Sequence, residues 1–195
     1  MAFKDSTLFL KWERRAQEAN ITRNTAAAID WFRNVIRKDK AVSFDRVLEG
    51  VSALKKSPTS FKPGQMFTYT YNPKYKDKLP FYDIYPLIVV AELTDTGWYG
   101  FNIHYLPPIL RAELFKEIVY FKRNPADIAK RLAKHPLTAA CIKQYLHKQL
   151  VTPPVSIPKE EWEIAIQLPY EGFQKSTNTK VWANSRLRIA KKSYK

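Results

Sequence analysis

Three consecutive strand-like runs constrain the fold of this chain more than any other feature. The runs are residues 65–71, 86–92 and 98–106. Asn72-Pro73 ends the first, and Asp95-Thr96-Gly97 joins the second to the third with residues that a tight hairpin prefers. The middle run is short and apolar, so both of its faces need cover. This pattern predicts a small SH3-like β-barrel or a curled antiparallel sheet.

Helical periodicity surrounds the strands and makes the predicted fold class α+β. We expect helices at residues 6–20, 25–38, 43–54, 109–122, 125–134 and 137–150. Trp162, Ile164 and Ile166 alternate with Glu163, Ala165 and Gln167, which predicts an edge strand that joins the sheet. In the last segment we expect a short helix around residues 185–192. The predicted organisation is an N-terminal helical region (1–60), a β-barrel module (61–171) with inserted basic helices (107–150), and a basic C-terminal tail (172–195).

Positive charge is the strongest compositional signal. The chain of 195 residues holds 33 Lys and Arg against 18 Asp and Glu, a net charge of +15. Residues 63–106 carry 3 basic and 4 acidic residues, so the excess lies in the flanking segments. A polyanion is the natural partner, because neutralised phosphates release counterions. We therefore predict that nucleic-acid phosphates are contacted by Lys74, Lys76, Lys78, Arg111, Lys122, Arg123, Lys130, Arg131, Lys134, Arg186, Arg188, Lys191 and Lys192.

No motif points to catalysis, a metal or a cofactor. His104, His135 and His147 do not form a metal pattern, and His104 is expected to be a hydrogen-bonded structural residue. Asp77 and Asp83 are six residues apart in a loop. They are compatible with acid–base chemistry and also with ordinary hydrogen bonds to the backbone of a turn.

Composition also bears on compartment and membrane contact. The single Cys141 lies in an apolar setting, which predicts a buried residue and a reducing compartment. No long apolar stretch predicts a membrane span or a secretory signal.

Aromatic residues concentrate in and around the predicted strands. Because strand side chains alternate, about half of these rings must lie in the core, and Phe67, Trp98 and Phe101 are predicted there. Tyr75 and Tyr82 lie beside Lys76 in a loop, where exposed rings can stack on unpaired bases or frayed ends. A tyrosine-rich protein interface is the alternative.

One block of sequence resembles a known family. GQMFTYTYNPKYKDKLPFYDIYPLIVVAEL and GWYGFNIHYLPPILRAELF, followed later by WEIAIQLPYEGF and VWANSR, are similar to the DNA end protectors of T-even-type tailed phages. The resemblance covers residues 64–115 well and residues 162–186 more loosely. It implies a minor virion protein, without catalytic residues, that guards the ends of the packaged genome from host exonuclease. It also implies a location in the virion, and in the host cytoplasm during assembly.

Two other functions are compatible with the sequence. A neck, connector or baseplate component would turn its charge toward packaged DNA or acidic neighbouring subunits, and would bind other virion proteins. The strand order also resembles the barrel of small bacterial toxin endoribonucleases, in which Lys76, Lys78 and Asp83 would be the candidate site of a nuclease. A homo-oligomer is left open.

Overall fold

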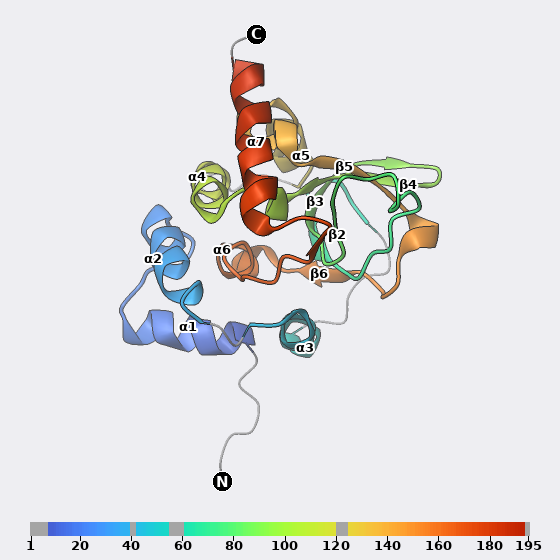
Figure 1. Cartoon of the computed structure of the whole chain (residues 1–195). Coiled ribbons are helices and arrows are strands. Elements are labelled where there is room, and N and C mark those ends of the chain that lie inside the picture. The colour runs from blue at the N-terminus through green and yellow to red at the C-terminus, as the bar shows by residue number, and fades with distance from the viewer. Residues whose placement is uncertain (1–7, 40–41, 55–60, 120–124, 194–195) are drawn as a thin grey trace.

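The apolar run at residues 87–90 lies in the centre of an open antiparallel sheet, as expected for a strand that needs cover on both faces. The computed structural model describes residues 8–39, 42–54, 61–119 and 125–193. The strand order is β5-β4-β3-β1-β6, and helices surround the sheet (Figure 1). The strands are β1 (Met66–Thr68), β3 (Leu87–Thr94), β4 (Gly97–Asn102), β5 (Ile142–Leu146) and β6 (Val155–Ile157). The α+β class and the antiparallel sheet are confirmed, but the sheet does not close into a barrel.

The two faces of β3 enter two different cores. Leu87 and Val89 belong to the large cluster that the helices cover, whereas Ile88 and Val90 belong to a smaller, mainly aromatic cluster. The aromatic members of this smaller cluster are Phe61, Phe67, Tyr69, Tyr71, Trp98 and Tyr145. Burial of Phe67, Trp98 and Phe101 confirms the predicted core residues. The hairpin is also confirmed, since Thr94 pairs with Gly97 across a two-residue turn.

The N-terminal helices form where their periodicity predicts them. They are α1 (Leu8–Glu18), α2 (Ala26–Ile36) and α3 (Phe44–Leu54). Thr25 caps α2, because its hydroxyl accepts a hydrogen bond from the Ala28 amide at 3.1 Å. Trp12 and Phe32 are completely buried and attach these helices to the large core.

Two helices between β4 and β5 begin at prolines, which suit the first helical turn. They are α4 (Pro108–Val119) and α5 (Pro125–Lys134). Helix α4 packs on α2, and α5 packs on β3. In the described residues, no helix is both long and apolar enough to cross a membrane.

Two predicted elements are wrong. The helix expected at residues 137–150 is a 3-10 turn (Pro136–Ala140), strand β5 and a second 3-10 turn (His147–Gln149). The edge strand expected around Trp162 is the short helix α6 (Trp162–Ala165), which follows a 3-10 turn (Lys159–Glu161), and β6 takes the place beside β1. Residues 161–168 are buried on every side, so apolar alternation carries no information about strand or helix there.

The C-terminal segment is more ordered than predicted. Strand β7 (Phe173–Gln174) pairs with β2 (Tyr82–Asp83), and a helix of 16 residues, α7 (Asn178–Ser193), replaces the expected short one. Helix α7 packs on the 3-10 turns Pro136–Ala140 and Ile103–Tyr105, and its far end extends away from α1 and α3 (Figure 1).

Candidate nucleic-acid interface

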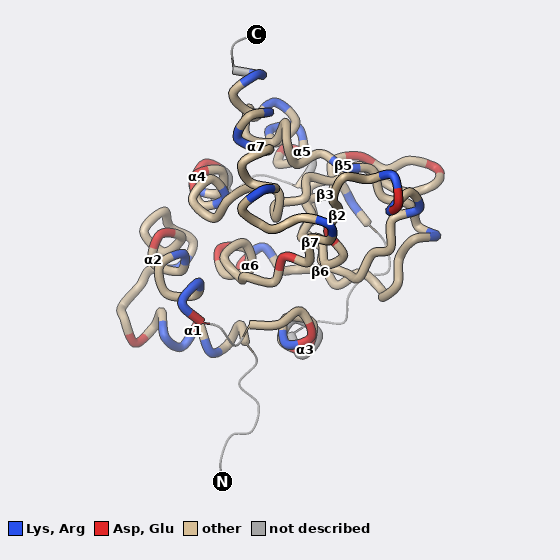
Figure 2. The backbone as a smooth tube through the Cα atoms, in the orientation of Figure 1, with Lys and Arg blue, Asp and Glu red and all other residues tan. Residues whose placement is uncertain are grey.

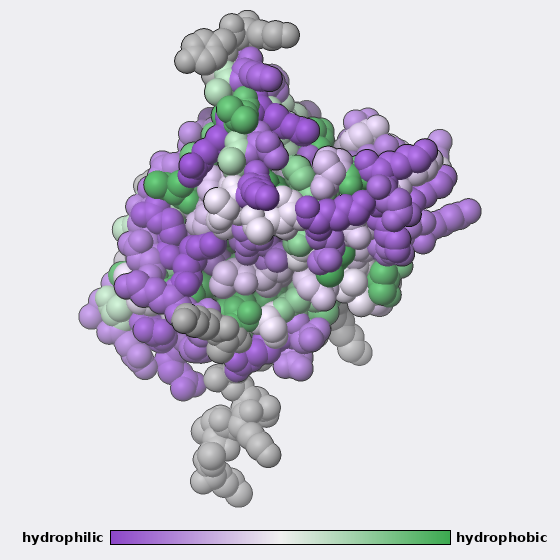
Figure 3. Space-filling view, viewed as in Figure 1, coloured by the Kyte–Doolittle hydropathy of each residue, from purple (hydrophilic) through white to green (hydrophobic). Residues whose placement is uncertain are grey.

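Helix α7 concentrates positive charge more than any other described element. It contains no Asp or Glu, and Val181 and Ser185 form its buried side. Thr177 directly precedes the helix, and its carbonyl accepts from the Val181 amide at 3.0 Å. All of its cations are exposed, and none forms an ion pair with a carboxylate of the described residues. These cations are Lys180, Arg186, Arg188, Lys191 and Lys192 (Figures 2 and 3).

Buried polar contacts anchor α7 to the body of the protein. The Trp182 indole donates to the His104 carbonyl at 2.9 Å, and the Asn178 amide donates to a Glu171 carboxylate oxygen at 3.5 Å. The guanidinium groups of Arg111 and Arg37 lie 5.8 and 5.6 Å from the centre of the Trp182 ring. The orientation of the charged helix is therefore set by an ordered internal network.

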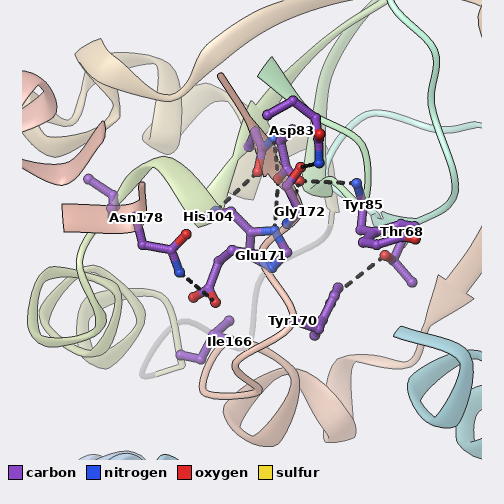
Figure 4. Close-up of polar contacts among 12 residues, drawn as sticks. Thr68, Asp83, Tyr85, His104, Ile166, Tyr170, Glu171, Gly172 and Asn178 are labelled. Atoms are coloured by element: carbon purple, nitrogen blue, oxygen red, sulfur yellow. Dashed lines mark hydrogen bonds and ion pairs between the residues drawn. The ribbon is translucent and has the colours of Figure 1, made fainter. Parts of the chain in front are cut away.

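Arg111 belongs to that network and not to the surface. Its side chain is fully buried and donates to the carbonyls of Leu106, Ile166 and His104 at 2.7, 3.3 and 3.1 Å. It also donates to Glu171 at 2.5 Å, and Figure 4 shows Glu171 between His104 and Asn178. Burial alone would raise the pKa of Glu171, but Arg111 and its neighbouring positive charges hold that pKa below its ordinary value. The sequence prediction that Arg111 contacts phosphate is therefore wrong.

Asp83 is likewise a structural carboxylate. One oxygen accepts from the amides of Tyr85 and Gly172, each at 3.0 Å, and the other accepts from Asn102 at 3.1 Å and the His104 ring at 2.8 Å (Figure 4). Four hydrogen bonds fill its acceptor positions. His104 thus has the structural role predicted for it. Asp77 is exposed, so the two loop aspartates occupy different environments.

The loop between β1 and β2 presents three lysines to solvent. Lys74, Lys76 and Lys78 are all exposed, as predicted. Lys175, from the segment before α7, holds this loop in place. Its ammonium donates to the carbonyls of residues 76, 77 and 79 at 2.6, 3.0 and 3.3 Å. These contacts restrain the backbone that carries the three cations.

A pocket with a volume of about 370 Å³ lies between this loop, strand β5 and α7. Six of its fifteen lining residues are aromatic, three are cations and one is a carboxylate. The aromatic residues are Tyr71, Tyr75, Phe81, Tyr82, Tyr105 and Tyr145, and the charged residues are Lys74, Lys143, Arg188 and Asp83. A second hollow shares Lys74, Tyr75, Gln144 and Leu146 with the first and continues along β5.

Lys143 is the most unusual cation of the pocket. Its ammonium lies 4.1 Å from the centre of the Tyr105 ring and donates to the Ala140 carbonyl at 2.9 Å. In the described residues it has no carboxylate partner. Burial is the main cause that lowers the pKa of Lys143 to about 8, and the nearby charge of Arg188 adds to the effect. The sequence analysis missed this residue because it was assigned to a helix.

A neutral residue at position 143 is expected to stabilise the protein. Lys143→Met removes a poorly solvated charge, so we expect the free energy of unfolding at pH 7 to rise by about 1–3 kcal/mol. Loss of the hydrogen bond from Lys143 to the Ala140 carbonyl offsets part of this gain. Because the pKa of Lys143 is lower in the folded than in the unfolded state, wild-type stability should rise relative to the variant between about pH 8 and pH 10.5. Urea unfolding across this range measures both effects, and equal stability at pH 7 would contradict them.

The other predicted cations lie on or near α5. Lys130, Arg131 and Lys134 are exposed there, on the same side of the molecule as α7 (Figure 2). Lys122 and Arg123 lie outside the described residues. Lys148, Lys175 and Lys180 were not predicted, although the absence of acidic residues from 178–193 is a signal for Lys180.

Around α1, α2 and α4, basic side chains pair with carboxylates. The pairs are Lys11–Asp39, Arg23–Glu13, Arg23–Glu163, Arg33–Asp30, Lys116–Asp30 and Lys116–Glu113. Exposed cations without a carboxylate partner among the described residues lie on α7 and in the loop 72–80, but Arg14, Arg15 and Lys38 on and after the N-terminal helices also lack one. Helix α7 differs from α1 because it contains no Asp or Glu at all.

The described residues contain neither a metal-binding cluster nor an exposed cysteine. Among them, no group of three or more His, Cys, Asp or Glu side chains could hold a metal ion. Cys141 is buried, as predicted, and burial raises the pKa of its thiol to about 12. At neutral pH this thiol is protonated and a poor nucleophile.

Comparison with known proteins gave one match. A family model described as the phage T4 terminal DNA protecting protein matches residues 9–187. The searches of curated proteins and of solved structures gave no match.

Proposed function

Because the chain belongs to the family of the phage T4 terminal DNA protecting protein, we propose that it binds the ends of double-stranded phage DNA and shields them from exonucleases. Binding uses phosphate contacts and no chemical step. The protein would be in the host cytoplasm during assembly and would then travel with the genome in the virion, in contact with other virion proteins.

The single observation that carries this proposal is the unpaired charge of α7. Five exposed cations on a helix without carboxylates create a positive field, whereas many cations of the α1–α2 side are matched to acids. Lysine and arginine side chains of this kind bind phosphates and release counterions. The loop lysines and the exposed cations of α5 extend the same field.

Phosphate contacts carry no base information, so binding should be independent of sequence. Trp182 and Asn178 fix the orientation of α7. A fixed orientation favours one docking geometry on DNA over non-specific coating of the duplex. A protein docked this way at a terminus blocks the entry of an exonuclease by occupying the strand ends.

The affinity for duplex DNA is expected to fall steeply with salt. Each neutralised phosphate contributes a slope of about −0.9 to a plot of log K against log salt concentration. Contacts from the five α7 cations alone would give a slope of about −4 to −5. Fluorescence anisotropy with a labelled 20-base-pair duplex at several salt concentrations measures it. A slope near zero would contradict the proposal.

End protection is tested by digestion. Linear duplex DNA with bound protein should survive a processive exonuclease, while an endonuclease should still cut the interior of the same DNA. Competition with a covalently closed circle distinguishes binding at the ends from binding along the whole duplex. If the circle competes as well as an equal mass of linear DNA, the protein coats DNA and does not select ends.

A further inference from the structure

The pocket beside β5 combines aromatic rings with positive charge in a space too small for a duplex. Its volume of about 370 Å³ lies at the lower end of the range for small-molecule sites, about 300–1,000 Å³. A duplex, whose grooves alone are about 6 and 12 Å wide, does not enter such a space. One unpaired nucleotide has suitable dimensions.

The charge of the pocket is suited to a phosphate. Lys74, Lys143 and Arg188 line it, and among the described residues none of the three pairs with a carboxylate. Asp83 is the one carboxylate of the lining, and its oxygens are directed to Tyr85, Gly172 and the other partners of the internal network. The three cations are therefore available to an anion that enters the pocket.

The rings of the pocket differ in accessibility. Tyr71, Tyr105 and Tyr145 are buried and form its base. Tyr75 is 58% exposed, with the Lys74 ammonium 5.1 Å from the centre of its ring. Phe81 and Tyr82, which are partly exposed, provide further apolar wall. Accessible rings next to cations are the combination on which proteins stack unpaired bases.

The pocket is also held open by specific contacts. The Tyr71 hydroxyl accepts from the Leu146 amide at 3.0 Å, which joins the loop to β5. Lys175 restrains the loop from the other side through the carbonyls of residues 76, 77 and 79. A preformed site loses less conformational entropy when a ligand binds. The second hollow, which continues along β5, provides room for the neighbouring part of the strand.

We propose that this pocket receives the unpaired nucleotide at the end of one DNA strand, with its base on Tyr75 and the aromatic wall and its phosphate near Lys74, Lys143 and Arg188. This inference rests on the proposed function and adds a specific element to it. The exposed cations of α7, the loop 72–80 and α5 bind duplex DNA of any sequence. The pocket instead recognises a terminus, because only a terminus supplies an unpaired nucleotide without the melting of internal base pairs.

The expected result is a preference for frayed or extended ends. A 20-base-pair duplex with two unpaired nucleotides at one terminus should bind more tightly than the blunt duplex. Tyr75→Ala should reduce that preference by roughly 5- to 100-fold, the range for loss of one stacked base, and should leave the affinity for the blunt duplex nearly unchanged. Tyr75→Phe, which keeps the ring, should retain the preference.

The experiment is fluorescence anisotropy with three DNAs that share one duplex: blunt, extended at the 5′ end and extended at the 3′ end. A 2-aminopurine in the extension reports stacking directly, because its fluorescence should fall on binding to wild type and not to Tyr75→Ala. The matched control is Lys134→Ala, an exposed α5 cation outside the pocket, which should weaken all three DNAs by the same factor. Tyr75 is largely exposed, so its variants should keep wild-type thermal unfolding.

Two results would overturn the inference and leave the proposed function intact. One is equal affinity for blunt and extended DNA, and the other is an unchanged preference in Tyr75→Ala, in either case with exonuclease protection preserved. Absence of binding to all three DNAs would overturn both proposals.

Discussion

Reversing three charges on α7 is expected to lower the affinity for duplex DNA by about 100-fold or more at 0.15 M salt and to abolish exonuclease protection. The variant is Lys180→Glu, Arg186→Glu and Lys191→Glu. Each substitution removes a phosphate contact and adds repulsion, so the salt slope should also become shallower. The three side chains are exposed and lie outside the pocket, and the anchors Trp182 and Ser185 are unchanged.

A control with the same change in net charge separates a local surface from overall attraction. The control changes three exposed cations of α1 and α3, helices that lie away from α7 in Figure 1: Arg14→Glu, Arg15→Glu and Arg46→Glu. We expect this control to lose less than about tenfold in affinity, through weaker long-range steering only. Anisotropy titrations and digestion of linear DNA compare the two variants. Equal losses in both would show that no particular face binds DNA.

Arg111→Met is expected to destabilise the protein by about 3–5 kcal/mol, because it leaves Glu171 buried without its main partner. Three backbone carbonyls also lose the hydrogen bond that Arg111 donates, although the His104 carbonyl keeps the one from Trp182. Arg37 alone, at 3.7 Å from the Glu171 carboxylate, cannot replace these contacts. Urea unfolding measures the loss, and hydrogen exchange should show α7 opening more readily, since the Arg111 guanidinium lies against Trp182.

The double variant Arg111→Met with Glu171→Gln tests the cause. Removing both charges leaves no isolated buried ion, so it should be more stable than Arg111→Met alone. The pH dependence gives a second check. The pKa of Glu171 is lower in the folded than in the unfolded state, so its contribution is present above about pH 4.3 and is lost as the pH falls below that value. Wild-type stability of the Arg111→Met single variant would contradict this explanation.

Local sequence patterns predicted most of the helices and the central hairpin. Helices α1 to α5 begin and end near their caps and prolines, and β3 and β4 join across Asp95-Thr96. These elements form because their signals are short-range: apolar spacing, an N-cap hydroxyl or a turn-forming pair. The same signals placed the exposed lysines of the loop at residues 74, 76 and 78.

The errors occur where burial is uniform or where distant segments meet. Residues 142–146 contain helix-compatible spacing but become β5, because the edge of β4 is available to pair with them. Arg111 was placed on the surface because arginine in a helix is usually solvated. Its carboxylate partner, Glu171, is 60 residues away, and nothing in the local sequence indicates that they meet.

The amino-acid sequence by itself determined that this protein is an α+β fold with a nearly neutral strand region and a large positive charge in the flanking segments, from which we predict an affinity for polyanions. Only the tertiary structure decided which cations face solvent together and which are buried or paired. It also brought the loop 72–80, β5 and α7 around one pocket. The physical reason is that charge and periodicity are local properties of a chain, whereas ion pairing and cavities depend on contacts between segments far apart in it.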